Sequence, residues 1–573
     1  MHVEGRVRTI AWCALYAALI ALAAFRLPVL YDEAYYWTWS RALSATYVDH
    51  PPGIAYILRL STDILGDGYL GLRVPAVLAM GVVALSAWAS ARRLSVHAMS
   101  GPAGPGPGAG AIAVAMLGGS LMFGLGYLAS TPDPYQGAAL SVASYFLIVF
   151  FTRARPASRL SSFFVPFLAS FFFVAAVLIK LSSAAVLFGV LLGLASHPTG
   201  RRVFCAPGFI AGAICVGALG SWWCVAELTG ATALATATTN SASAIMASTT
   251  ITTSASAAIS ATNSVPSASA AFQWARVAHG HHARGIVAIP LVLGAMMLTF
   301  GPLTAFSLGR LSVSTIRVHG WSHEHPARRA LLWGSALLLF ACVGAAWLGA
   351  GELNWPMPAL IVALPVVAAH VARERSAYRT WFLWSVRVCA GLVMVLLIHI
   401  VHPFLPIEPT RDRTLRSAGF EAVTHALERV AQEEGVKAVL VDRYQWASML
   451  RYHSRDRLQV VELGRSRRSQ YDVWPRLGLC PGDRVLVVGS GPGVASDGIE
   501  RQGEEHVFER RRGDRLVGAV YWAVARVTRP MFGAGRVSDV SGVSAVSSGG
   551  GIIGGGGGAD GADARARCRA ETL

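Results

Sequence analysis

The first two-thirds of the chain alternate between long apolar segments and short polar connections. Most of the apolar segments have the roughly 17–25 residues that an α-helix needs to cross about 30 Å of hydrocarbon, so we expect about eleven transmembrane helices. The apolar pattern places them near residues 9–25, 69–90, 109–129, 135–152, 161–179, 181–196, 206–227, 285–308, 331–350, 356–372 and 381–402. Together they predict a polytopic α-helical membrane domain over residues 1–408.

The pattern changes after the last apolar segment. Residues 409–530 are rich in charge and predict a small α/β domain, with a helical stretch at 419–434 and β-type runs at 437–442, 458–463, 484–489 and 516–527. Two segments are low in complexity: residues 229–271 are almost entirely Ala, Thr and Ser, and residues 531–573 are rich in Gly. Neither can bury enough apolar surface to order itself, so we expect an exposed loop and a disordered tail.

Composition and charge support a membrane protein and predict which side of the membrane each connection faces. The 573 residues are 54% hydrophobic and 14% charged, with a mean hydropathy of +0.48, whereas soluble domains average about 25% charged residues. The net charge of +17 would suggest a nucleic-acid partner in a soluble chain. Here the arginines gather in every second short connection, as the positive-inside rule predicts. We therefore expect no nucleic-acid partner, a cytoplasmic N-terminus, and a C-terminal domain outside the inner (plasma) membrane. The arginines at 510–512 are interpreted as a solvated face or an interfacial contact.

With the sides assigned, the remaining polar motifs fall on the outer membrane face. The first outer loop, residues 26–68, contains the run YDEAYYWTWSRALSATYVDHPP, in which ionisable groups lie among aromatic side chains. No Asp, Glu or Lys occurs in the middle of an apolar segment, which favours a reaction centre at the outer interface over an ion path through the bilayer. The candidate site residues in these loops are Asp32, Glu33, Asp49, His50, Asp133, Lys180, Asn354 and Trp355.

Most of these candidates also have a structural interpretation, and the sequence leaves both open. Lys180 is one of only two lysines, and its compact charge suits a phosphate, but its long side chain could also simply reach toward the membrane surface. Asp133 could bind sugar hydroxyls or cap the helix that follows it. Asp49 and His50 could contact substrate, or the two prolines after them could orient the next helix without any chemistry.

The other polar candidates can likewise be interpreted as functional or as structural residues. Glu33 could assist Asp32, or it could stabilise the N-terminus of the juxtamembrane helix in which it lies, where a carboxylate is favourable. Asn354 and Trp355 could offer a hydrogen bond and a stacking face to a sugar, or they could pack in the core of the bundle.

Several short motifs occur in a characteristic order. They are YDEAYYW, DHPP, TPD, Lys180 after an apolar segment, FQW at 272–274, NWP at 354–356, DRYQ at 442–445 and SQYDVW at 469–474. This set resembles the GT-C membrane glycosyltransferases, and within them the bacterial relatives of aminoarabinose transferases and protein O-mannosyltransferases. The resemblance covers residues 7–527.

The resemblance implies transfer of a sugar from a polyprenyl-phosphate donor to a lipid, glycan or protein acceptor on the outer face, with inversion at the sugar carbon. It also implies that Asp32 is the catalytic residue, as a general base or as the holder of a divalent metal ion, with Glu33 assisting. Lys180 would neutralise the lipid phosphate that leaves. The alternative is a lipid-linked sugar flippase or a transporter, which repeated halves and mid-membrane ionisable residues would favour.

Overall fold

The computed structural model describes residues 15–97, 108–153, 158–221, 223, 225, 285, 288–317, 325–464, 467–493 and 497–531. The low-complexity loop at 229–271, the FQW motif and nearly all of the Gly-rich tail lie outside these residues. The chain forms two compact units, which are described separately. The first comprises Met1–Leu27, Trp39–Leu228 and Ala268–Leu405, and the second comprises Pro28–Thr38, Thr229–Ser267 and Pro406–Leu573.

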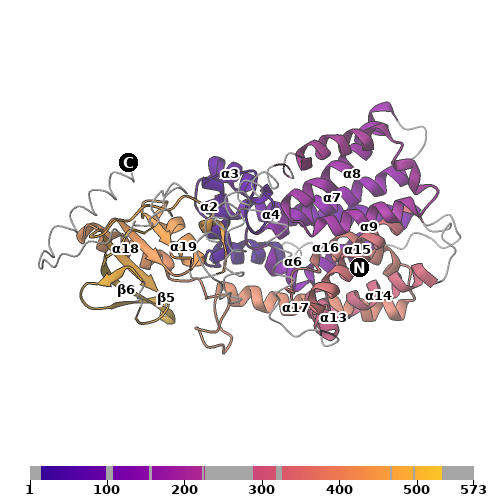
Figure 1. The fold of residues 1–573 in the computed structure, drawn as a ribbon. Helices are drawn as coiled ribbons and strands as arrows, with labels where there is room; N and C mark the ends of the chain where they lie inside the picture. Colours follow the sequence, from indigo (N-terminus) through magenta and orange to yellow (C-terminus); the bar gives the residue numbers. More distant parts are fainter. Residues whose placement is uncertain are drawn as a thin grey trace, which may run out of the picture. The chain divides into compact units, whose positions relative to one another are not determined.

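The described part of the first unit is helical (Figure 1). In addition to helices Leu15–Arg26 and Pro207–Ser221, it contains α3 (Gly53–Leu65), α4 (Tyr69–His97), α5 (Ala109–Gly118), α6 (Leu121–Gly126), α7 (Pro132–Thr152), α8 (Arg159–Ile179), α9 (Ser183–Ala195), η1 (Gly200–Val203), α13 (Ala288–Phe300), α14 (Pro302–Arg317), α15 (Pro326–Trp347), α16 (Met357–Val371) and α17 (Ser376–Val401). The helix α2 (Tyr31–Arg41) contributes its last three residues to this unit.

The membrane prediction is confirmed in its main feature. Among the described residues, five helices are long and apolar enough to cross a membrane, or up to seven if each of two bent helix pairs forms one span. Four shorter apolar helices accompany them. Each predicted apolar segment coincides with at least one of these helices, and the chain is a multi-pass membrane protein. The count of eleven spans stays a prediction.

Helix α16 forms the centre of the first unit. Nearly all of its residues are buried, and it contacts α4, α5, α7, α9, α14, α15 and α17. A helix that is apolar on every side is stable only when other protein or lipid surrounds it. The N-terminus of α16 immediately follows the predicted NWP motif, so the core of the bundle fixes the position of Asn354.

The second unit contains a six-stranded mixed sheet. Its strands are β1 (Ala438–Val441), β2 (Val460–Glu462), β3 (Arg484–Gly489), β4 (Ile499–Arg501), β5 (His506–Arg512) and β6 (Arg515–Val527). The order is β2-β1-β3-β6-β4, with β5 paired to β6. β1 is parallel to β2 and β3, whereas β6 is antiparallel to β3, β4 and β5. All four residues of β1 are buried, as expected for a parallel strand covered on both faces.

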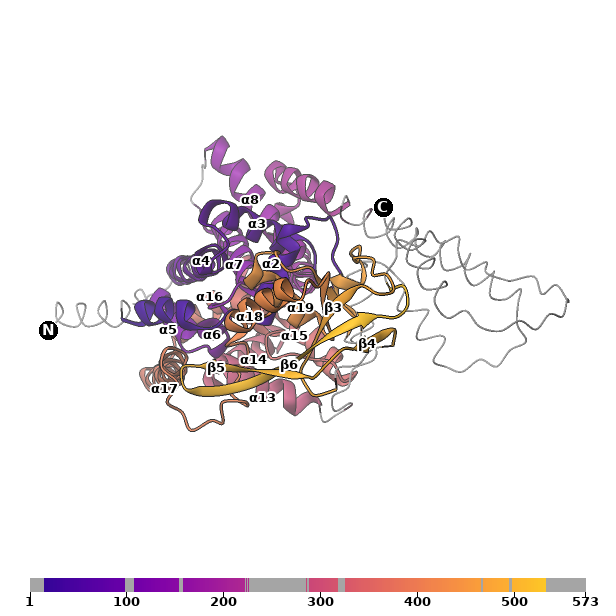
Figure 2. The same cartoon turned by 90° about the vertical axis from the view of Figure 1, so that its left-hand side faces the viewer.

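Two helices accompany the sheet (Figure 2). Helix α18 (Phe420–Glu433) contacts β5, and α19 (Tyr444–Ser454) contacts β1 and β2. A short 3₁₀ turn, η3 (Gln470–Asp472), follows β2. Elements α18, β1, β2, β3 and β6 coincide with the predicted runs, so the predicted α/β character is confirmed. α19, β4 and β5 were not predicted.

Within the arginine run of β5, the interpretation as a solvated face is wrong for Arg510. This side chain is buried, and its Nη1 donates to the carbonyl oxygens of Arg416 and Ala418 at 2.9 and 3.1 Å. Its guanidinium also lies 4.7 Å from the ring centroid of Phe420. Burial among these groups lowers the pKa of Arg510. Arg511 does fit the expectation, because it is exposed and pairs with Glu509.

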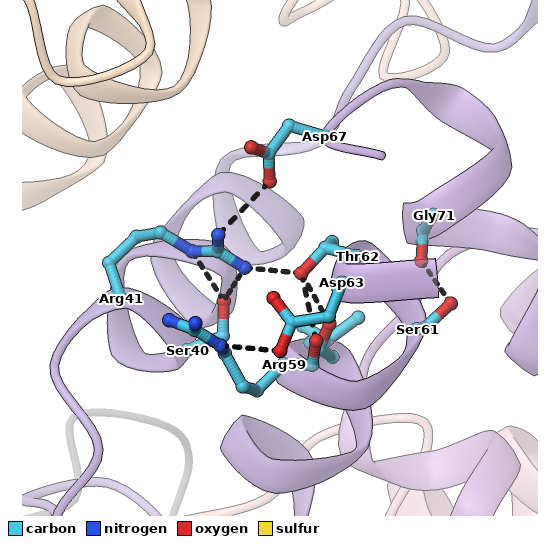
Figure 3. Close-up of polar contacts among 9 residues, drawn as sticks. Ser40, Arg41, Arg59, Ser61, Thr62, Asp63, Asp67 and Gly71 are labelled. Carbon is cyan, nitrogen blue, oxygen red and sulfur yellow. Dashed lines mark hydrogen bonds and ion pairs between the residues drawn. The ribbon is translucent and has the colours of Figure 1, made fainter. Parts of the chain in front are cut away.

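Polar contacts hold the end of α2 to α3 within the first unit (Figure 3). The guanidinium of Arg41 donates to Thr62 of α3 and lies 3.4 Å from the carboxylate of Asp67, in the turn before α4. Ser61 Oγ donates to the carbonyl oxygen of Gly71 at 2.7 Å, which ties α3 to α4. These contacts fix the end of α2, the helix α3 and the start of α4 relative to one another.

Candidate functional site

Asp133, Lys180 and Asn354, three candidates from three predicted loops, are in direct contact. Lys180 Nζ lies 2.7 Å from Asp133 Oδ1, and Asn354 Nδ2 donates to Asp133 Oδ2 at 3.0 Å. The Lys180 and Asp133 side chains are only 10% and 14% exposed. Because Asp133 lies in the first turn of α7, Lys180 directly after α8 and Asn354 just before α16, the contacts join three helix ends.

These contacts bear on the interpretations left open for Lys180 and Asp133. The Lys180 ammonium does not simply extend to solvent, because it is paired and mostly buried. An ammonium has three donors, and the contact with Asp133 uses one of them. The N-cap residue of α7, Thr131, makes no side-chain capping bond, and the Asp133 carboxylate in the first turn accepts hydrogen bonds from Lys180 and Asn354 at two other helix ends. Partly buried charges of this kind are stable only when they are paired and hydrogen-bonded.

Gln136 extends this network by one turn of α7. The side chain is fully buried, and its Nε2 donates to Ser182 Oγ at 2.8 Å and to Ser183 Oγ at 2.7 Å. Ser182 is the N-cap residue of α9 and Ser183 is its first residue, shortly after Lys180 in the sequence. Asp133 and Gln136 are three residues apart on one helix face, so together they hold both sides of the break between α8 and α9. Gln136 was not among the predicted site residues; the signal available was an amide one turn into an apolar helix.

The segment before α16 presents a half-buried aromatic ring. Trp355 Nε1 donates to Glu352 Oε2 at 3.3 Å, while the neighbouring Asn354 side chain points to Asp133. Trp355 is thus adjacent in sequence to the residue that binds Asp133, and its side chain is partly accessible. The ring does not belong to the buried core, in contrast to the residues of α16.

The DHPP motif lies beside the end of α8. Asp49 is buried and His50 half-buried, and Pro52 is the N-cap residue of α3. A Cβ on Gly53 would lie 2.8 Å from the carbonyl oxygen of Leu178, two residues before Lys180. Only glycine permits this approach without displacement of the backbone. The prolines thus lead into α3, and the first residue of this helix approaches the end of α8.

Asp32 and Glu33 lie in the first turn of α2 and belong to the second unit. Asp32 is exposed, whereas Glu33 is fully buried. Glu33 Oε2 accepts a hydrogen bond from the Leu30 backbone N–H at 3.0 Å, so its carboxylate stabilises the start of the helix. The capping interpretation of Glu33 is therefore observed, and an assisting catalytic role stays a prediction.

Aromatic residues fix this part of α2 inside the second unit. Tyr35 is 1% exposed, and its hydroxyl oxygen accepts the Gln470 N–H at 2.7 Å. Its ring centroid lies 4.8 Å from that of Tyr444. One turn earlier, Tyr31 donates to the Arg416 carbonyl oxygen at 2.9 Å. The helix turn that carries Asp32 is thus positioned by residues more than 380 positions later in the sequence.

Metal binding at Asp32 was a prediction from resemblance. In the described part of the chain, no three His, Cys, Asp or Glu side chains converge in a way that could hold a metal ion. Metal binding by Asp32 at the donor phosphate stays a prediction from the resemblance.

Comparison with known proteins gives matches of two kinds. Residues 49–225 match the family described as dolichyl-phosphate-mannose-protein mannosyltransferase. No curated protein sequence matches the chain significantly. Among solved structures, ArnT from Cupriavidus metallidurans bound to undecaprenyl phosphate is similar, with a TM-score of 0.57, 14% identity, and coverage of 90% of this chain and 97% of that chain. The apo state of ArnT from the same organism gives a TM-score of 0.55, 13% identity, and coverage of 91% and 98%.

These matches confirm the predicted resemblance and the fold class. The chain has the GT-C membrane fold of ArnT, with an α/β region toward its C-terminus. At this level of identity the likeness is one of fold, and the family match covers the part of the chain from the DHPP motif through Asp133 and Lys180.

Proposed function

We propose that this protein is a membrane glycosyltransferase that moves a sugar from a polyprenyl-phosphate donor to a lipid, glycan or protein acceptor at the outer face of the cell membrane. The observation that carries the proposal is the contact of Asp133, Lys180 and Asn354 at three helix ends of an ArnT-like fold. The ArnT structure contains undecaprenyl phosphate, a lipid carrier of the proposed donor class.

Lys180 is the proposed partner of the donor phosphate. Its pairing with Asp133 holds the ammonium in place in a partly buried position, while leaving two donors for phosphate oxygens. As the bond between the sugar and the phosphate breaks, negative charge grows on the departing lipid phosphate. A fixed positive charge stabilises that change more than it stabilises the bound donor, which is the requirement for catalysis.

Asp32 is the proposed general base. An acceptor hydroxyl oxygen attacks the anomeric carbon, its proton passes to the Asp32 carboxylate, and the bond from that carbon to the phosphate oxygen breaks. The polyprenyl phosphate leaves with the bonding electron pair. A single displacement of this kind inverts the configuration at the sugar carbon. The exposure of Asp32 in the first turn of a helix held by buried tyrosines supports this role.

The remaining candidates are proposed to contact the sugars. Asp49 and His50 shortly precede Gly53, which closely approaches the end of α8 before Lys180, and they are proposed to supply hydrogen-bonding groups to the substrate. Asn354 holds Asp133, and the half-exposed Trp355 offers an aromatic face to a sugar ring.

The proposed orientation has the N-terminus in the cytoplasm and the C-terminal unit outside. The arginine-rich ends of the helices support it: Arg153 follows α7, Arg159 begins α8, and Arg373 follows α16. Each of these lies at the opposite end of its helix from Asp133, Lys180 or Asn354. Positive residues at helix ends remain on the cytoplasmic side.

The test is replacement of Asp32 by Asn in the full-length protein, with Asp63→Asn as a matched control from the same loop. Asp63 is exposed and pairs only locally with Arg59. Mass spectrometry of polyprenyl-phosphate sugars and envelope glycans compares cells with the wild-type gene, without it, and with each variant. Deletion and Asp32→Asn should both accumulate one lipid-linked sugar and lose one glycan, whereas Asp63→Asn should resemble wild type. Normal glycans in Asp32→Asn cells at wild-type protein level would contradict the role of Asp32, and unchanged lipids and glycans on deletion would contradict the function.

A further inference from the structure

A groove of about 270 Å³ lies in the second unit, and none of the predicted site residues lines it. It is bounded by the end of α19, the strand β2 and the segment after η3. Its polar and aromatic lining consists of Arg451, Asp456, Glu462, Tyr471, Trp474 and Arg476. The volume falls just below the range of about 300–1,000 Å³ that is typical of sites for drug-sized ligands, so the groove suits a small ligand.

The charges in this groove balance. The lining contains two arginines, one aspartate and one glutamate, so their formal charges sum to zero. Arg451 Nε lies 2.6 Å from Asp456 Oδ1, and Arg476 Nη2 lies 3.6 Å from Glu462 Oε2 and 2.7 Å from Oδ1 of Asp472, which does not line the groove. A site that selects a phosphate or a metal ion needs an excess of one sign, which this lining lacks. The groove therefore favours a neutral ligand.

Aromatic surface occupies one side of the groove. The Trp474 and Tyr471 rings meet edge to face with centroids 5.3 Å apart, and the guanidinium of Arg451 lies 5.6 Å from the Trp474 centroid. Tyr471 is 5% exposed, whereas Trp474 is half-buried and accessible. This lining matches a ligand that has apolar C–H faces and polar hydroxyl edges. The aromatic rings can pack on the C–H faces, while the guanidinium and carboxylate groups form hydrogen bonds with the hydroxyls.

The backbone at the groove is held in an unusual conformation. Arg455 and Asp456 have φ values of 53° and 58°, and they are the only non-glycine residues with positive φ in the described part of the chain. The ion pair with Arg451 holds Asp456 in this turn, as does the hydrogen bond from the Asp456 N–H to the Arg451 carbonyl oxygen at 2.9 Å. Strained residues of this kind concentrate at binding sites, where the surrounding contacts enforce them.

We propose that this groove binds a single sugar ring of an uncharged glycan. Trp474 supplies the stacking face, and Arg451, Asp456, Glu462 and Arg476 supply hydrogen bonds to the hydroxyls. An extended peptide added to the sheet edge is the competing ligand, but the edge strand β2 has only three residues, which gives little length for strand pairing. The further statement that this ring belongs to the acceptor rests on the function proposed above; the binding itself does not.

The experiment is saturation-transfer difference NMR on the full-length protein in detergent micelles, without donor. The probes are the methyl glycosides of glucose, galactose, mannose, N-acetylglucosamine and arabinose, each at millimolar concentration. We expect transfer to ring protons of at least one glycoside, and at least a fivefold loss of that signal in Trp474→Leu. The matched control is Trp522→Leu, since Trp522 stacks on His506 and Phe508 in the sheet and does not line the groove.

Several results would overturn the proposal. These are an absence of transfer to all five glycosides, equal signals in the two tryptophan variants, or displacement of a bound glycoside by an unrelated extended peptide. If Trp474→Leu does not fold, Arg476→Gln takes its place, because it keeps the aromatic surface and removes one hydrogen-bonding fork. Binding is measured without transfer, so a failure of the proposed enzyme activity and a failure of this groove appear in separate measurements.

Discussion

The Asp133 carboxylate accepts hydrogen bonds from two segments, and its two partners contribute differently. The hydrogen bond from Lys180 involves two charged groups, and bonds of this kind add about 1.5–3 kcal/mol to the stability of the folded state. The hydrogen bond from the neutral Asn354 amide adds less, about 0.5–1.5 kcal/mol. The sequence identified all three residues through their positions at helix ends. It could not pair them, because nothing local relates positions 133, 180 and 354.

Lys180→Ala should raise the KM for the lipid donor about tenfold or more and should also lower the turnover rate, because one charge-assisted contact is removed from both the bound donor and the departing phosphate. The effect on the acceptor KM should be small. The measurement is initial transfer rates at varied donor concentration with purified protein. Lys437→Ala is the matched control, as it removes the only other lysine, which pairs with Asp483 in the second unit. An unchanged donor dependence in Lys180→Ala would remove its phosphate role.

A double-mutant cycle separates the ion pair from the chemistry. Lys180→Met leaves the Asp133 carboxylate partly buried without its cation, so the free energy of unfolding should fall by about 1–3 kcal/mol. Asp133→Asn in the same chain should recover part of that loss, because the uncompensated charge disappears. Chemical denaturation in detergent micelles measures the coupling energy. Additive effects of the two substitutions would show that the pair contributes nothing to stability.

The element that departs most from expectation is α2. Its aromatic run indicated a lined site, and the structure gives these rings packing partners in the second unit: Tyr31 on Phe420, Tyr35 on Tyr444 and Trp37 on Tyr452. Such partners are hundreds of residues away and leave no periodic signal. Strand β5 was not predicted because its sequence, HVFERRR, is charged and lacks an apolar run. The strand pairs with β6 off the main path of the sheet, where much of it stays exposed and charged side chains are tolerated.

Tyr35→Phe should reduce the turnover rate more than it changes either KM, because the Gln470 N–H loses its acceptor and the turn that carries Asp32 is held less firmly. An unpaired buried donor costs about 1–3 kcal/mol. Hydrogen exchange of the amides in residues 28–38 should increase at the same time. Tyr56→Phe, which alters an exposed hydroxyl on α3, is the control. Unchanged exchange and turnover in Tyr35→Phe would show that this bond does not position α2.

Gly53→Ala should destabilise the first unit by about 1–3 kcal/mol, since the added methyl group would overlap the Leu178 backbone and force α3 and α8 apart. Thermal unfolding followed by light scattering or intrinsic fluorescence gives the measurement. The control is Gly68→Ala, because a Cβ there meets nothing within 4 Å. Equal melting temperatures for the two variants would contradict the close approach of α3 to the end of α8.

At the scale of the whole molecule, the apolar pattern predicted the membrane bundle well, because each segment must satisfy its backbone hydrogen bonds within a helix. The β-type runs predicted the centre of the sheet, where strands such as β1 are buried on both faces. Residues 28–38 belong to the second unit although a membrane domain surrounds them in sequence. The order of the segments along the chain therefore could not predict that residues 28–38 belong to the second unit.

The second unit should lose stability in mild acid through His453 of α19. Burial, with Arg455 and His425 nearby, lowers the pKa of His453 to about 4. The unfolded chain binds this proton near its ordinary value of 6.5, so folding is fully favoured above that pH and weakens as the pH falls toward 4. The loss is at most about 3 kcal/mol, and smaller where water reaches the ring.

Hydrogen exchange of the α19 amides, corrected for intrinsic rates and measured from pH 7 to 4.5, tests this dependence in the full-length protein. Protection should fall with pH in the wild type and fall less in His453→Gln. Parallel curves for the two proteins would assign the acid sensitivity to other groups.

The bond from Gln470 to Tyr35 also sets an order of events during synthesis. These residues are 435 positions apart, and at about 5–20 residues per second the ribosome needs roughly 20–90 s to travel between them. For most of that interval the turn that carries Asp32 exists without the partners that hold it, the first of which is Arg416. The proposed catalytic carboxylate is therefore made among the first residues and placed among the last, so a chain that terminates before residue 416 has the membrane helices but none of these contacts.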